Sequence, residues 1–162
     1  MNDLRPYYQK QKELDAYIQK EHHETYLSTT KKRMLALLVE LGEFANETRC
    51  FKFWSLKGPS PKEVILDEYA DGLHFFFSLG IPLRCEDFQI GEIKEDLPLT
   101  EQILLVYQKI ASLSESYDRA HYFSAFASYW DLLGGLGYTI EEALAAYEKK
   151  LVVNYQRQEN HY

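Results

Sequence analysis

Apolar side chains recur at steps of three and four residues along most of this chain, which is the pattern of amphipathic α-helices. The clearest example runs from about Thr30 to Trp54, where the apolar positions are Met34, Leu37, Leu38, Leu41, Phe44 and Ala45. Similar spacing predicts helices over about 7–26, 61–79, 99–114, 118–133 and 140–158. Without a strand pattern between them, the sequence predicts a single all-α domain over residues 1–162, a bundle of about six helices.

Helix breakers and capping residues set the expected boundaries. Ser60 with Glu63, and Thr139 with Glu142, have the spacing of capping boxes and are expected to open the third and last helices. Gly80 and Pro82 are expected to end the third helix. Residues 83–98 keep no period and predict an irregular segment.

The composition is that of a globular protein. Of 162 residues, 46% are apolar and 27% charged, close to the ~45–50% and ~25% of folded domains, which excludes disorder over the whole chain. The formal charge of −7 leaves no excess of cations for a nucleic-acid backbone, so no nucleic-acid partner is expected. Cys50 and Cys85 form no CxxC motif and are expected to be free thiols.

No segment predicts a membrane span or a secretion signal. The longest apolar run, Leu73 to Leu83, contains a histidine, a glycine and a proline and is far shorter than the ~20 residues that cross a bilayer. The N-terminal residues MNDLRPYYQKQKELD lack the apolar stretch of a signal peptide. The sequence therefore predicts a cytoplasmic protein without a membrane partner.

Two pairs of acidic residues are the candidate chemistry. Glu40 and Glu43 lie beside the apolar stripe of the second helix, where they could be simply a solvated acidic edge. Glu68 and Asp71 lie three apart on the third helix, which is apolar on nearly every side and should be buried. Acidic side chains are rarely buried unpaired, so this second pair needs a cationic side chain or a metal ion.

Four carboxylates from two helices suit a hard divalent cation such as Mg²⁺, which takes oxygen ligands and retains waters for chemistry. The spacing of three residues aims both side chains of each helix at one place. An ion-pair network among these acids and nearby cations remains the structural alternative.

The ExxE motif at Glu40, a spacer, and the ExxD motif at Glu68 resemble the all-α nucleoside triphosphate pyrophosphohydrolases, which include MazG-like enzymes. The segments ELGEFANETRCFKFW, DEYADGLHFFFSLGI and KKLVVNYQRQ, with Gln11-x-x-Leu14-Asp15, are similar to the dimeric dUTPases in particular. The resemblance implies a helical homodimer that hydrolyses dUTP to dUMP and pyrophosphate. Whether dUDP is also a substrate, giving dUMP and phosphate, stays open. It also implies Mg²⁺, for which Mn²⁺ could substitute.

The resemblance also implies the roles of individual residues. Glu40, Glu43, Glu68 and Asp71 become metal ligands, and Glu43 or Glu40 the catalytic acceptor of a proton from the attacking water. The remaining implied contacts are to the substrate: Gln11 and Trp54 to the base, Lys52, Lys150 and Arg157 to phosphate, Asn154 to sugar or base, and Asn46 to the substrate or a carboxylate.

Two alternatives remain open from the sequence. The first is a pyrophosphohydrolase of the same fold that acts on another nucleotide, such as dCTP or a modified dNTP. The second is a helical interaction module without catalysis, in which the acidic pairs form ion pairs and the aromatic side chains form an interface. A substrate panel separates the first alternative, and a metal titration separates the second.

Overall fold

A computed structural model describes residues 2–162, and these residues form six α-helices and no strand. The predicted all-α class and the number of helices are therefore confirmed. The helices are α1 (Arg5–His22), α2 (Tyr26–Thr48), α3 (Lys62–Gly80), α4 (Leu99–Glu115), α5 (Arg119–Leu136) and α6 (Ile140–Glu159).

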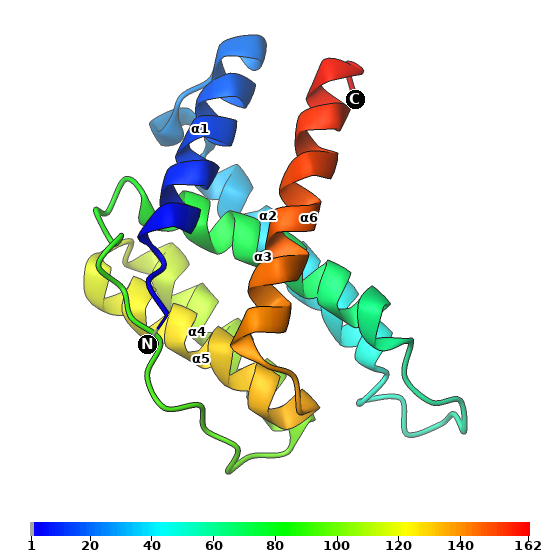
Figure 1. The fold of residues 1–162 in the computed structure, drawn as a ribbon. Coiled ribbons are helices and arrows are strands. Elements are labelled where there is room, and N and C mark those ends of the chain that lie inside the picture. Colours follow the sequence, from blue (N-terminus) through cyan, green and yellow to red (C-terminus); the bar gives the residue numbers. More distant parts are fainter. Residues whose placement is uncertain (1) are drawn as a thin grey trace.

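The third helix is the centre of the arrangement. It packs along α2 and also contacts α1, α5 and α6. In Figure 1, α1 and α6 stand above α3, whereas α4 and α5 pair with each other below it. The C-terminal ends of α1 and α6 both lie at the top of this view. This order of layers follows from α3, the only helix among residues 2–162 that is buried almost continuously over its second half.

Aromatic side chains fill much of the core between the layers. The rings of Tyr69 and Tyr129 stack with centroids 4.3 Å apart. Each hydroxyl donates to the backbone carbonyl of the other residue, at 3.0 Å from Tyr69 and 2.7 Å from Tyr129. Gly72 faces this pair, because a Cβ atom there would lie 2.1 Å from the Tyr129 hydroxyl. The two tyrosines therefore fix α5 against α3 beside the acidic motif.

The boundary between the first two helices was predicted wrongly. The first helix ends at His22 and not near Tyr26, because His23 adopts a left-handed conformation with φ 56° and its N–H donates to the Gln19 carbonyl. The second helix then begins at Tyr26 and not near Thr30, capped by Thr25, whose side chain accepts from the Ser28 N–H. The apolar spacing continues across this turn, so periodicity alone did not reveal it.

The end of α2 and the start of α3 also differ from the prediction. Helix α2 ends at Thr48, six residues before Trp54, because Arg49 is left-handed with φ 55°. The predicted capping box at Ser60 does not form: Pro61 is the N-cap of α3 and makes no side-chain cap. The Ser60 hydroxyl instead donates to the Glu47 carboxylate, which ties the 49–61 segment back to α2.

The later boundaries agree better with the prediction. Thr139 and Glu142 form the predicted capping box at α6, and residues 83–98 are irregular as expected. Helix α5 runs three residues further than predicted, through Gly134 and Gly135 to Leu136, and ends at the left-handed Gly137. No helix of the described residues is both long and apolar enough to span a bilayer.

Candidate active site

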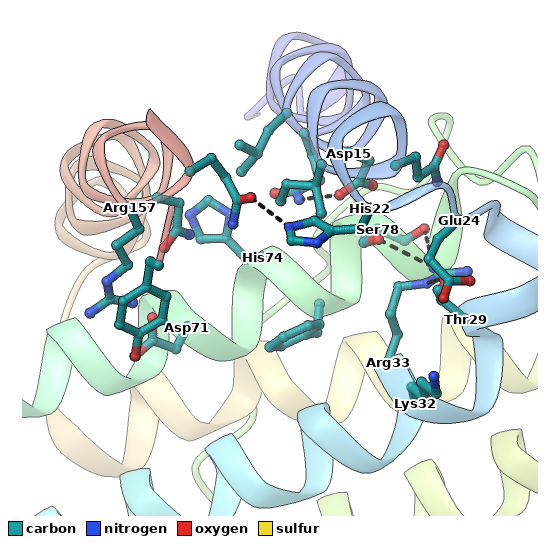
Figure 2. A pocket seen from close by; sticks show the side chains of 18 of the residues that line it. Asp15, His22, Glu24, Thr29, Lys32, Arg33, Asp71, His74, Ser78 and Arg157 are labelled. Carbon is teal, nitrogen blue, oxygen red and sulfur yellow. Dashed lines mark hydrogen bonds between the residues drawn. The ribbon is translucent and has the colours of Figure 1, made fainter. Parts of the chain in front are cut away.

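A cavity of about 420 Å³ opens between α1, α2, α3 and α6. This volume lies within the ~300–1,000 Å³ typical of small-molecule sites. Figure 2 shows Asp71 and Arg157 at one end of the cavity and Arg33 and Thr29 at the other, with His74 between them. The cavity is therefore long, with an acidic end and a mixed polar end.

Three carboxylates converge at the acidic end. Glu40 of α2 and Glu68 and Asp71 of α3 each offer an oxygen, and these oxygens lie within 4.8 Å of one another. One oxygen of Glu40 and one of Glu68 are buried without a hydrogen-bond partner. Unpartnered buried carboxylate oxygens are costly unless a cation satisfies them. The donor set is all oxygen, which suits a hard divalent cation.

Burial and mutual repulsion change the acidity of this group. Burial, followed by the charges of Asp71 and Glu43, raises the pKa of Glu40 to about 8. Burial, again followed by the charge of Asp71, raises the pKa of Glu68 to about 7. Burial also raises the pKa of Asp71, although Lys150 opposes this rise. Near pH 7 the metal-free group therefore holds protons that a bound cation would displace.

Lys150 of α6 approaches the same group from the side. Its ammonium donates to Asp67 at 2.8 Å and lies 3.2 Å from the nearer oxygen of Asp71. The Lys150 side chain is only 6% exposed, so it is held there by packing as well as by charge. Lys150, which the sequence predicts to contact phosphate, is therefore the counter-ion of Asp67 and Asp71 in this structure.

His74 lies one turn after Asp71 and is almost wholly buried on the wall of the cavity. Neither ring nitrogen has a hydrogen-bond partner. Burial and the charge of Lys150 lower the pKa of His74 to about 3. The imidazole is therefore neutral at physiological pH, with one donor and one acceptor free for a ligand.

The predicted site residues divide into three groups. Those that line the cavity are Gln11, Glu40, Asp71, Asn154 and Arg157. Glu68 and Lys150 adjoin it through Asp71, and Glu43 is exposed one turn along α2 from Glu40. Asn46, Lys52 and Trp54 do not line the cavity.

The 49–61 segment explains the positions of Lys52 and Trp54, whereas Asn46 is an exposed residue of α2. This segment projects at the end of α2 and α3 far from the upper ends of α1 and α6 (Figure 1). Trp54 is 65% exposed there and packs against Phe51 and Phe53. The Lys52 ammonium lies 5.8 Å from the centroid of the Phe51 ring.

Several residues of the site were not predicted as substrate or metal contacts. Asp15, Arg33, His74, Phe75 and Ser78 line the cavity, and Asp67 pairs with Lys150. A signal existed on α3, since positions 71, 74, 75 and 78 continue one helical face from the acidic motif into the cavity. No comparable signal marked Arg33, whose position depends on the turn at His23.

A family model described as dUTPase matches residues 3–162, nearly the whole chain. The chain belongs to the dUTPase family. The predicted family is thus confirmed, and the protein is an enzyme that hydrolyses dUTP to dUMP and pyrophosphate. Its substrate is a nucleotide, and the family requirement for a divalent metal fits the three converging carboxylates. A comparison with curated proteins found no match.

The acidic group predicts an unusual pH dependence of stability. A carboxyl whose pKa is higher in the folded than in the unfolded protein stabilises the fold at low pH, and this contribution is lost as the pH rises. For Glu40 and Glu68 this stabilising contribution is lost between about pH 4.5, the usual pKa of the side chain, and about pH 8, the raised pKa of Glu40. His74 has a lowered pKa, so its contribution to stability is lost as the pH falls. This loss begins only below pH 6.5, the usual pKa of histidine.

We therefore expect the melting temperature of the metal-free dUTPase to fall between pH 6.5 and 8.5. A divalent cation should reduce this fall, because it neutralises the ionised carboxylates and binds only the folded protein. Thermal melts in a chelator and in excess Mg²⁺ test this expectation. A melting temperature that rises with pH in the chelator would contradict it.

The Lys150 contact gives a second expectation. Lys150→Met keeps the length and packing of the side chain but leaves Asp71 and Asp67 without their cation. Loss of a hydrogen bond to a charged group costs ~1.5–3 kcal/mol, or roughly 3–10 °C in melting temperature for a chain of this size. Lys149→Met is the matched control, because Lys149 is exposed on the same helix. Equal melting temperatures for the two variants would argue against a stabilising pair.

Proposed function

We propose that the enzyme hydrolyses dUTP at the cavity with Mg²⁺ held by Glu40, Glu68 and Asp71. The observation that carries this proposal is the convergence of three carboxylates at the cavity end, two of them with buried unpartnered oxygens. An ion there neutralises the triphosphate and lowers the pKa of a water molecule. Mn²⁺, which also accepts oxygen ligands, is proposed as a substitute.

Glu43 is proposed as the acceptor of the proton from the attacking water. It lies three residues after Glu40 and is exposed, so its carboxylate is accessible to solvent beside the acidic group. In the reaction the water loses a proton to this carboxylate, its oxygen bonds to phosphorus, and the bond to the leaving phosphate oxygen breaks. Glu40 is the other proton acceptor that the sequence suggests. One of its oxygens is buried among the three carboxylates, so Glu40 is better suited to bind the metal ion.

The C-terminal helix is proposed to hold the triphosphate. Asn154 and Arg157 lie on the cavity wall near Asp71. Arg157 offers a planar guanidinium that can contact two phosphate oxygens at once. Lys150 adds a positive charge beside the carboxylates, and this charge becomes available to phosphate when a metal ion takes over Asp71.

The opposite part of the cavity is proposed to bind the nucleoside. Gln11 and the neutral His74 supply hydrogen-bonding groups, and Phe75 supplies an apolar surface. Trp54 and Lys52, with Asn46, remain predicted substrate contacts from the sequence. None of the three lines the cavity in this structure. Trp54 and Lys52 need a movement of the 49–61 segment toward the cavity, whereas Asn46 lies on α2.

We also propose that residues 1–162 form one domain, that the protein is cytoplasmic, and that it is a homodimer. Large apolar side chains exposed along α2 support the dimer, namely Leu27 at 89%, Leu35 at 63% and Val39 at 52%. Light scattering after size exclusion tests it, since a dimer has twice the 19.1 kDa of the chain. A single species at the mass of one chain would exclude it.

The decisive experiment measures pyrophosphate release from dUTP, dCTP and dTTP, and phosphate release from dUDP, with Mg²⁺, with Mn²⁺ and with a chelator. We expect release from dUTP that requires the metal and is absent with dTTP. Preferred hydrolysis of dCTP would instead favour the alternative substrate. A chelator-resistant activity would overturn the metal assignment.

A further inference from the structure

The side-chain amide of Gln11 is held on both sides by other side chains. Gln11 is 3% exposed on α1, yet it lines the cavity. Its Nε2 donates to Asp15 Oδ1 at 2.8 Å. Its Oε1 accepts a hydrogen bond from the Tyr147 hydroxyl of α6 at 3.0 Å. The Tyr147 hydroxyl also lies 3.4 Å from the Tyr7 carbonyl, so the bond to Gln11 is the shorter of its two contacts. The Asp15 carboxylate, which only accepts, identifies the amide nitrogen, and the Tyr147 hydroxyl supports the assignment of the oxygen.

Both partners are themselves fixed. The second oxygen of Asp15 accepts from the Tyr26 hydroxyl at 3.0 Å, which holds the carboxylate in place. The Tyr147 ring is buried, with the His74 ring centroid 4.3 Å away and that of Phe77 5.1 Å away. A reversed Gln11 amide would place its oxygen against the carboxylate oxygen of Asp15, where neither atom can donate. The reversed orientation is therefore strongly disfavoured.

These two bonds leave one N–H and one oxygen lone pair of Gln11 free for a ligand. Uracil presents a carbonyl acceptor beside an N–H donor on its pairing edge, whereas cytosine presents an amino donor beside a nitrogen acceptor. An amide held in one orientation places its N–H and its oxygen so that both form hydrogen bonds with one of the two bases, whereas with the other base donor faces donor and acceptor faces acceptor. An amide that turns freely serves both.

We infer that Asp15 and Tyr147 are positioning residues that fix the Gln11 amide and so set the preference for a uracil over a cytosine base. This inference rests on the proposed function, in which Gln11 contacts the base. It adds that the discrimination resides in two side chains behind Gln11, one on α1 and one on α6.

The test compares Tyr147→Phe with Tyr155→Phe. The first variant removes the hydroxyl that donates a hydrogen bond to the Gln11 amide oxygen. The second removes a hydroxyl from the same helix, where Tyr155 contacts the Tyr17 ring and does not line the cavity. We measure kcat and KM for dUTP and dCTP, and the inhibition constants of dUMP and dCMP, which report base preference even where dCTP turnover is too slow to measure.

We expect Tyr147→Phe to reduce the preference for uracil over cytosine by at least about tenfold. The change should appear as a higher KM for dUTP and a lower inhibition constant for dCMP, with kcat for dUTP within about twofold. Tyr155→Phe should keep the wild-type ratio. A merely structural role for Tyr147 would weaken both nucleotides equally and leave the ratio unchanged, which would overturn the inference.

Asp15→Asn is the second variant, for use also if Tyr147→Phe folds poorly. The asparagine amide can either accept from or donate to Gln11, so it no longer selects one orientation, and the same loss of preference is expected. Gln11→Ala separates base recognition by Gln11 from the positioning of Gln11 by its two partners. If it leaves the base preference intact, Gln11 does not read the base and the proposed function is wrong at this point. If it abolishes the preference while Tyr147→Phe and Asp15→Asn do not, only the positioning inference fails.

Discussion

Replacing Glu68 with glutamine is expected to reduce dUTP hydrolysis by roughly a thousandfold while making the metal-free protein more stable. The activity falls because one oxygen ligand of the proposed metal site becomes a neutral amide, and metal stabilisation of a reacting phosphate contributes several kcal/mol. At a pH above the pKa of about 7 that burial and the charge of Asp71 give Glu68, stability rises because the substitution removes one of the converging negative charges. Pyrophosphate release and melting in a chelator measure the two effects separately.

The opposite signs make this prediction specific. A residue that only supports the fold would lose activity and stability together. Glu63→Gln is the matched control, since Glu63 is exposed in the first turn of the same helix, and it should change neither property by much. A Glu68→Gln variant with wild-type turnover at saturating Mg²⁺ would exclude Glu68 as a required ligand.

Replacing Gly72 with alanine is expected to destabilise the protein by about 2–4 kcal/mol. Alanine usually stabilises a helix relative to glycine, but here the added methyl would lie 2.1 Å from the Tyr129 hydroxyl and 2.7 Å from its ring carbon Cζ. Relief requires Tyr129 to leave its stack on Tyr69 and its bond to the Tyr69 carbonyl. For a chain of this length the melting temperature should fall by roughly 5–15 °C.

The same substitution should also lower activity, because Asp71 is the preceding residue and any shift of α3 away from Tyr129 would move it. Gly91→Ala serves as the control: nothing lies within 4 Å of a Cβ atom at that position. Equal melting temperatures for Gly72→Ala and Gly91→Ala would contradict this prediction, because they would show that Tyr69 and Tyr129 can move apart with little loss of stability.

The sequence predicted the helices well and their ends less well, for a physical reason. Helix periodicity reports which face is buried, and it identified α2, α3 and their acidic motifs. The turn at His23 depends on one residue in a left-handed conformation, and His carries no strong signal for it. The same holds for Arg49, which ends α2 before the aromatic segment.

Pair spacing predicted the acidic group better than it predicted the cations. Glu40, Glu68 and Asp71 meet because two helices pack with their motifs facing each other, which the motif spacing anticipates. The contact of Lys150 with Asp67 and Asp71 joins residues 83 and 79 positions apart. Only the packing of α6 on α3 brings them together, and no local pattern encodes that packing angle.

The arrangement of the cavity bears on how such an enzyme can acquire a new substrate. The carboxylates come from α2 and α3, which pack extensively on each other, whereas Gln11 and Asp15 come from α1, which meets α6 over a smaller area. In the proposed arrangement Gln11 and Asp15 therefore lie on a different helix from the carboxylates, although His74 and Phe75 share α3 with two of them. Substitutions on the inner face of α1 can change which nucleobase is accepted while the hydrolytic apparatus stays intact, so a shift in specificity can evolve in small, individually viable steps.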